Sequence, residues 1–167
     1  MSEMKKRWIA LYVENDVGVL AKVSGLFSGK SYNLQSLTVG TTEDETVSRM
    51  TISVESDDIT FEQIKKQLNR MVEVIKVIDL TNVPLRLKEL MFVKVNSCTE
   101  KDKAEAFRIS QVYGVKIEDY NKNTILFECT MTEDKNNSLL KLLSETYGYR
   151  LEVVRGGAVA IEAVSYT

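Results

Sequence analysis

Residues 8–39 read WIALYVENDVGVLAKVSGLFSGKSYNLQSLTV, and this stretch decides the fold because two spacings of apolar side chains follow each other within it. Apolar and aromatic residues occupy both faces of Trp8–Val13 in alternation, which is typical of a β-strand. Apolar residues then recur at helical spacing after Gly18, namely Val19, Leu20, Val23, Leu26 and Phe27. An extended pattern resumes at Asn33–Val39. The stretch therefore predicts a strand, a helix and a second strand.

The pattern continues with a hairpin, a helix and a strand. Apolar residues alternate over Ser48–Val54 behind a polar turn, which predicts a hairpin with the preceding strand. Thr60 and Gln63 match a capping box that opens a second helix, and Val72–Leu80 is a further strand. The complete order is the βαββαβ or ferredoxin-like arrangement. Because both helices then lie on one face of the sheet, we expect dimerisation to cover the other face.

The same order recurs after Pro84, the chain's only proline, which places a boundary near residues 81–88. We predict an α+β protein of two ferredoxin-like modules, residues 1–82 and 83–167. The expected elements of the second module are a strand at Leu90–Val95, a helix at Thr99–Tyr113 ended by Gly114, strands at Val115–Tyr120 and Thr124–Met131, a leucine-rich helix ended by Gly148, and a strand at Tyr149–Val154. The segment RGGAV, residues 155–159, is expected to turn into a last strand at Val159–Ala163.

Composition argues against several classes of function. The 167 residues are 44% apolar and 28% charged, which is ordinary for a soluble globular chain. The net charge is -2 without a basic cluster, so we expect no nucleic-acid partner. No apolar run approaches the roughly 20 residues that cross a bilayer, so we expect no membrane association and a cytoplasmic protein. The sequence has no histidine and only Cys98 and Cys129, so we expect no metal site and no Ser-His-Asp or Cys-His catalysis, which disfavours an enzyme.

The turn before the first helix has two interpretations. A helix N-terminus offers unpaired N–H groups and a positive dipole, so backbone atoms around Gly18 are suited to a carboxylate, and Asn15 is suited to bind a ligand or to cap the helix. The alternative is an ordinary cap at Asn15 or Asp16 with no ligand. A dinucleotide site is disfavoured because the G-x-G-x-x-G spacing is missing, and Gly25 is expected to permit close helix packing.

Two further positions leave alternatives open. Asn33 opens the second strand, which we expect to run beside the first strand, so that its amide faces the same opening as Gly18. Alternatively, Asn33 simply follows a turn. Arg155, beside Gly156 and Gly157, is suited to present a charge to a partner, whereas a bulged turn is the other interpretation.

With these residues in place, the sequence resembles the family of acetolactate synthase small regulatory subunits. The resemblance covers almost the whole chain, and its carriers are VENDVGVLAKVSGLFSGKSYNLQSLTVG at 13–40, SRMTI at 48–52, FEQIKKQLNRMVEVIKVIDL at 61–80, LKELMFVKV at 87–95 and VVRGGAVAI at 153–161. It implies an N-terminal ACT domain, a ferredoxin-like amino-acid sensor that dimerises through its sheet. The ligand it implies is valine or another branched-chain amino acid, and the matching site positions are Asn15, Gly18, Val19, Leu20, Asn33 and Leu34.

The resemblance also implies a mechanism without an active site on this chain. The family's large catalytic subunit carries thiamine diphosphate, FAD and magnesium, and the regulatory subunit activates it and confers feedback inhibition by valine. The sequence departs from the family at Val17, Lys22 and VVRGGAV, which concerns ligand preference more than subunit identity. Three alternatives remain: an ACT-type sensor that regulates a different enzyme, a ferredoxin-like RNA-binding protein and a histidine-free enzyme. The sequence lacks the aromatic pattern and the basic sheet face that an RNA-binding protein of this fold requires.

Overall fold

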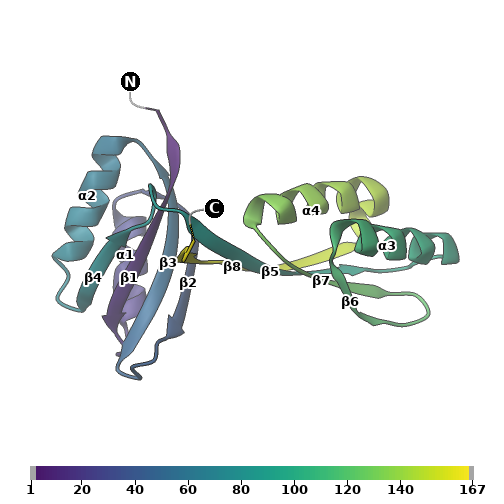
Figure 1. Cartoon of the computed structure of the whole chain (residues 1–167), viewed down its shortest axis with the longest axis horizontal. Coiled ribbons are helices and arrows are strands. Elements are labelled where there is room, and N and C mark those ends of the chain that lie inside the picture. The colour runs from purple at the N-terminus through teal and green to yellow at the C-terminus, as the bar shows by residue number, and fades with distance from the viewer. Residues whose placement is uncertain (1–2, 166–167) are drawn as a thin grey trace. The chain divides into compact units, whose positions relative to one another are not determined.

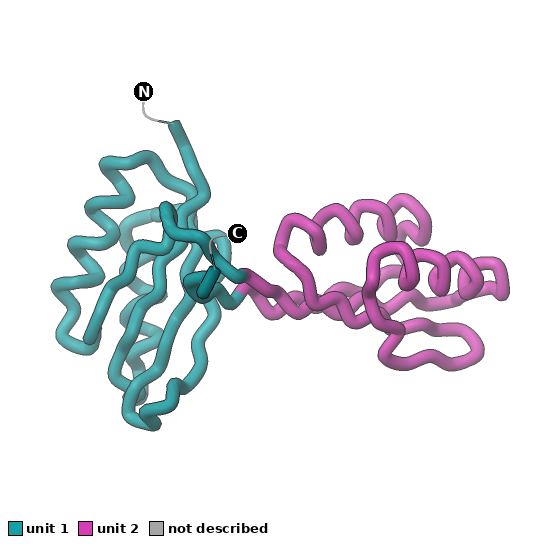
Figure 2. Tube along the Cα trace, viewed as in Figure 1, with its two compact units in different colours: residues 1–86, 159–167 teal, residues 87–158 magenta. Residues whose placement is uncertain are grey.

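The structure is a computed structural model that describes residues 3–165. Its contacts divide the chain into two compact units, residues 1–86 with 159–167 and residues 87–158 (Figure 2). Each unit contains its own hydrophobic core. These units are defined by contacts alone, which do not test where each predicted module begins and ends. The domain limits 1–82 and 83–167 therefore stay a prediction.

The first unit contains a four-stranded antiparallel sheet with two helices (Figure 1). Its elements are β1 (Lys5–Glu14), α1 (Val19–Gly29), β2 (Asn33–Thr41), β3 (Val47–Ser56), α2 (Asp58–Asn69) and β4 (Val74–Asp79). Ile9 and Ile52 on one face of the sheet are fully buried against Val23 of α1 and Ile64 of α2. Both helices therefore cover the same face, and the predicted βαββαβ order is confirmed.

The strand order of this sheet corrects one prediction. The order is β2-β3-β1-β4, so β1 pairs with β3 and β4, while β2 pairs only with β3. The prediction that the strand opened by Asn33 runs beside the first strand is wrong. The helical crossover from β1 to β2 leaves room for one strand, and β3 occupies it by folding back from β2 as a hairpin.

Two local details of the helices also differ from the predictions. The α2 helix begins one turn earlier than the capping-box motif indicated, because the Asp57 side chain accepts a hydrogen bond from the Thr60 N–H at 2.7 Å. Thr60 is therefore a first-turn residue and not the cap. Gly25 is exposed in the middle of α1, and no atom lies within 4 Å of where its Cβ would stand. Within this chain it permits no close helix packing.

The second unit repeats the topology. Its elements are β5 (Leu85–Val95), α3 (Glu100–Tyr113), β6 (Lys116–Tyr120), β7 (Ile125–Met131), α4 (Glu133–Tyr147), a 3₁₀ turn (Gly148–Arg150) and β8 (Leu151–Glu162). The strand order is β6-β7-β5-β8. Gly114 ends α3 with φ of 66°, as predicted, because the left-handed region suits glycine. The turn expected at RGGAV is wrong: β8 runs through it as one strand, and Gly157 takes φ of 83° within that strand.

The start of α3 leads to a prediction about acid stability. Asp102 forms a capping box with Thr99 and an ion pair with Arg150 at 2.7 Å. The Arg150 guanidinium, together with the Thr99 N–H, holds the pKa of Asp102 well below its usual range. The ionised Asp102 carboxylate therefore contributes its full share of the free energy of unfolding above pH 4, and this share is lost as the pH falls toward the lowered pKa.

We expect Asp102→Asn to cost about 1 kcal/mol of unfolding free energy at pH 7, as loss of a helix cap does, and to flatten the stability profile between pH 5 and 2. Urea unfolding across this pH range measures both effects. Glu105→Gln is the matched control because Glu105 forms only an exposed pair with Arg108. An unchanged acid slope in Asp102→Asn would assign the acid sensitivity to other carboxylates.

Candidate functional site

The turn between β1 and α1 leaves backbone donors unpaired. Gly18 is the N-cap of α1, with φ of 89° and no side chain to cap the helix. The Val19 N–H reaches the Asp16 carbonyl at 3.4 Å, and the first intrahelical bond runs from the Lys22 N–H to the Gly18 carbonyl at 3.0 Å. Between them, the Leu20 and Ala21 N–H groups have no acceptor among residues 3–165. Two donors at the positive end of the helix dipole are therefore available to a carboxylate.

The surroundings of this helix start are open, and the exposed carboxylate of Asp16 lies in the turn itself. The Val17 side chain is fully exposed and Leu20 is 43% exposed, so apolar surface flanks the free N–H groups. Lys22 forms an ion pair with Glu73, and this pairing lowers the pKa of Glu73. Because Glu73 already neutralises the nearby ammonium, the attraction for an anion comes from the backbone and not from a basic side chain.

Asn15 does not cap the helix, and its side chain binds the β2–β3 hairpin. Its Nδ2 donates to the Glu45 carbonyl at 2.9 Å, and its Oδ1 accepts from the Ser48 hydroxyl at 3.0 Å. Its backbone N–H donates to the Thr46 carbonyl at 2.8 Å. Asn15 therefore fastens the loop before α1 to the β2–β3 hairpin instead of capping the helix. Its contact with a ligand stays a prediction.

Asn33 and Leu34 lie at the other end of the same sheet. Glu14, just before the turn, pairs with Val47, whereas Asn33 pairs with Glu55 at the far end of β3. Eight residues of extended chain separate Val47 from Glu55, which corresponds to roughly 26 Å. The six predicted site residues thus form two groups, and a single chain does not bring the Asn33 amide to Gly18. Asn33 is exposed, and Leu34 is partly buried against the core.

Arg155 forms its contacts within the second unit. Its Nη2 and Nε donate to Glu89 Oε1 at 2.6 and 3.1 Å, and its Nη1 donates to Asn137 Oδ1 at 2.6 Å. Glu89 is 4% exposed and also accepts from Asn136 Nδ2 at 3.1 Å. The Arg155 charge is therefore used to neutralise a buried carboxylate, which was neither of the two interpretations of this residue.

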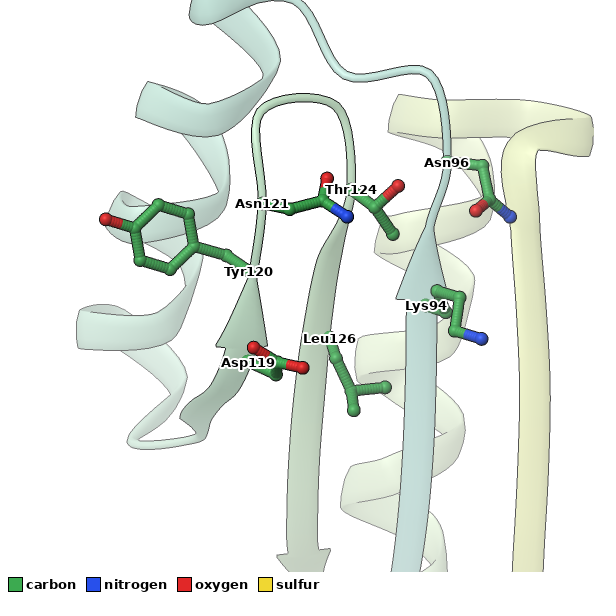
Figure 3. Close-up of a pocket in the computed structure, with 7 residues that line it drawn as sticks. All are labelled: Lys94, Asn96, Asp119, Tyr120, Asn121, Thr124 and Leu126. Carbon is green, nitrogen blue, oxygen red and sulfur yellow. The ribbon is translucent and has the colours of Figure 1, made fainter.

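The sequence interpretation missed a polar hollow of about 320 Å³ on the second sheet. Its lining residues are Lys94, Asn96, Asp119, Tyr120, Asn121, Thr124 and Leu126 (Figure 3). Lys94, Leu126 and Asp119 are cross-strand neighbours on β5, β7 and β6, so Leu126 separates opposite charges. These three residues are far apart in the sequence, and only the strand pairing shows that they are neighbours. Lys94 lies 3.5 Å from Glu152, which partly neutralises it, and Figure 3 shows Tyr120 pointing away from Leu126.

The described residues show no metal cluster, and both cysteines are buried. No cluster of three or more His, Cys, Asp or Glu side chains that could hold a metal occurs within residues 3–165. Cys98 and Cys129 are both buried, and burial raises the pKa of Cys129 to about 11, which disfavours the nucleophilic thiolate. Over the same residues, no helix has the length and apolar character to cross a membrane.

Comparisons with known proteins agree along the chain. Residues 9–76 match the family described as "AHAS small subunit-like ACT domain", and residues 88–164 match "Small subunit of acetolactate synthase". The acetolactate synthase small subunit of Aquifex aeolicus is 40% identical over 95% of this chain and 82% of its own length. The probable acetolactate synthase small subunit of Archaeoglobus fulgidus is 41% identical over 93% of this chain and 96% of its own length.

A solved structure supports the same comparison. The crystal structure of the acetolactate synthase small subunit from Thermotoga maritima is 32% identical in sequence, with a TM-score of 0.86. The match covers 96% of this chain and 99% of the other.

Proposed function

The chain belongs to the family of acetolactate synthase small subunits, and we propose that it activates a large catalytic subunit of acetolactate synthase and inhibits it when valine is bound. The membership supports a regulatory subunit with a catalytic partner. In this proposal the partner carries thiamine diphosphate, FAD and magnesium, and both subunits act in the cytoplasm in branched-chain amino acid biosynthesis. This chain performs no chemistry. It contributes the amino-acid site and the contact through which that site acts.

The free N–H groups at the start of α1 are the observation that carries the proposal. The valine carboxylate accepts hydrogen bonds from the Leu20 and Ala21 N–H groups, in the positive potential of the helix start. The isopropyl group contacts the exposed apolar surface near Leu20. The valine ammonium requires an acceptor of its own, and the Asn15 amide is already engaged with the hairpin. The amide oxygen of Asn33 is suited to this task.

A second copy of the chain supplies Asn33. Because β2 is an edge strand, its outer side is suited to pair with another β2. A twofold axis makes that pairing antiparallel, so the Asn33 end of one β2 lies beside the Thr41 end of the other. Thr41 pairs with Ser48, at the same end of the sheet as Gly18. A homodimer through the ACT domains therefore joins the two groups of site residues that one chain keeps apart.

Reconstitution with the catalytic subunit tests the proposal. We expect the purified chain to form no acetolactate alone, to raise the rate of the catalytic subunit, and to lose this effect as valine is titrated. Valine, leucine and isoleucine are compared in the same assay. Calorimetry measures valine binding with and without the catalytic subunit, since coupling of about 1–3 kcal/mol changes valine affinity by about 5- to 150-fold.

The outcomes separate this proposal from the alternative of an ACT-type sensor for a different enzyme. Amino-acid binding with no effect on acetolactate formation would favour the alternative. Activation without any response to a branched-chain amino acid would retain the regulatory role and remove the proposed effector.

A further inference from the structure

Arg49 of β3 carries a charge that no described residue neutralises. It makes no salt bridge within residues 3–165, and its Nε is buried without a hydrogen-bond partner. Buried donors are nearly always paired in folded proteins, and a guanidinium retains its charge at any physiological pH. The buried Nε of this half-buried cation therefore indicates that an acceptor from outside the chain belongs beside it.

The position of Arg49 is fixed by its neighbours in the sheet. Arg49 pairs across strands with Tyr12 of β1 on one side and Gly40 of β2 on the other. The guanidinium carbon lies 5.8 Å from the centroid of the Tyr12 ring, which is a cation–π contact. Arg49 alternates with the buried Met50, so its side chain is on the sheet face opposite the core. The charge is held on a rigid strand and not on a loop.

A hollow of about 200 Å³ opens beside this guanidinium. Its lining residues are Thr38, Val39, Gly40, Thr41, Arg49, Thr51 and Val159. Gly40 contributes no side chain, and no atom lies within 4 Å of where its Cβ would stand, so space is left where a side chain would otherwise cover Arg49. The volume is several times the about 30 Å³ that one water molecule occupies in the liquid. The hollow is therefore large enough for a carboxylate group.

We propose that this hollow receives the carboxylate of an aspartate or glutamate side chain of the catalytic subunit. A carboxylate matches the planar guanidinium in charge and shape. In a side-on approach, one carboxylate oxygen accepts a hydrogen bond from the unpaired Nε. One cation balances one carboxylate. A free carboxylic acid gains only this contact and is held weakly, whereas a side chain on a docked subunit is kept at high effective concentration by the rest of the interface. The inference rests on the proposed function.

Subunit affinity tests the inference. Wild-type chain, Arg49→Gln, Arg49→Lys and Lys76→Gln are immobilised separately, and binding of the purified catalytic subunit is measured by interferometry. Lys76→Gln is the matched control, because exposed Lys76 pairs across strands with Tyr12 on the same sheet face and carries the same charge. Thermal unfolding confirms that each variant is folded. We expect at least a tenfold loss of affinity for Arg49→Gln, a smaller loss for Arg49→Lys, and less than a twofold change for Lys76→Gln.

Each other outcome overturns a specific statement. Equal losses in Arg49→Gln and Lys76→Gln mean general charge attraction and contradict a built site. An affinity of Arg49→Gln within twofold of wild type contradicts the inference alone, because the wild type still binds. If the wild type fails to bind, the proposed function fails and the inference falls with it. Should Arg49→Gln fail to fold, Arg49→Lys decides, since an unchanged affinity there contradicts recognition by the planar fork.

Discussion

Replacing Arg155 by alanine is expected to lower the free energy of unfolding by about 2–3 kcal/mol, because the buried carboxylate of Glu89 loses its partly exposed charged partner. Glu89 is 4% exposed, and Arg155 supplies two of its charge-assisted hydrogen bonds, at 2.6 and 3.1 Å. Without Arg155, the neutral amide of Asn136 is the one remaining donor to that side chain among residues 3–165. The cost therefore comes from a carboxylate left in a site that water barely reaches. Urea unfolding at pH 7, followed by circular dichroism, measures it.

Two variants make this result interpretable. Arg108→Ala removes an arginine whose pair with Glu105 is exposed, and we expect a change below about 1 kcal/mol. The double variant Glu89→Gln with Arg155→Ala removes both charges, so we expect it to be more stable than Arg155→Ala alone. If Arg155→Ala unfolds within 1 kcal/mol of wild type, Arg155 is not what stabilises the buried Glu89 side chain.

The sequence was informative where structure depends on local spacing. Alternation and helical periodicity predicted both βαββαβ modules, because each element must bury one face. The turn at Gly18 was predicted as a helix start with free backbone donors, and its φ of 89° and missing cap confirm the local geometry. The same reasoning also predicts that Glu89 is buried. It shares strand parity with Met91 and Val93, so a charged residue occupies a position on the buried face of β5.

Predictions failed where the structure depends on neighbours distant in sequence. The insertion of β3 between β1 and β2 moves Asn33 away from Gly18, and no local pattern encodes that strand order. Adjacent glycines at 156 and 157 resemble a turn, yet β8 continues through them. Arg49 lies in the block SRMTI, but its missing partner is evident only when Tyr12 and Gly40 are placed beside it.

Complementation between two defective chains is expected to identify the proposed two-chain valine site. Gly18→Val places a β-branched residue at φ of 89°, where such residues are strongly disfavoured, so the helix start must change shape. Asn33→Ala removes the amide at the other end of the sheet. We expect each variant alone to bind valine at least about tenfold more weakly, a loss comparable to that of a charge-assisted hydrogen bond. Gly25→Ala, in the exposed middle of α1, is the matched control and should bind valine normally.

Mixing the two variants then separates one-chain from two-chain sites. In a dimer of one Gly18→Val chain and one Asn33→Ala chain, one site combines both defects and the other combines an intact Gly18 with an intact Asn33. Random exchange in an equal mixture makes about half of the dimers mixed, so about a quarter of all sites should regain wild-type affinity. Calorimetry measures that fraction as a binding stoichiometry. A site built within one chain would regain nothing, because every chain in the mixture carries a defect, so the recovered fraction alone decides whether two chains share the ligand.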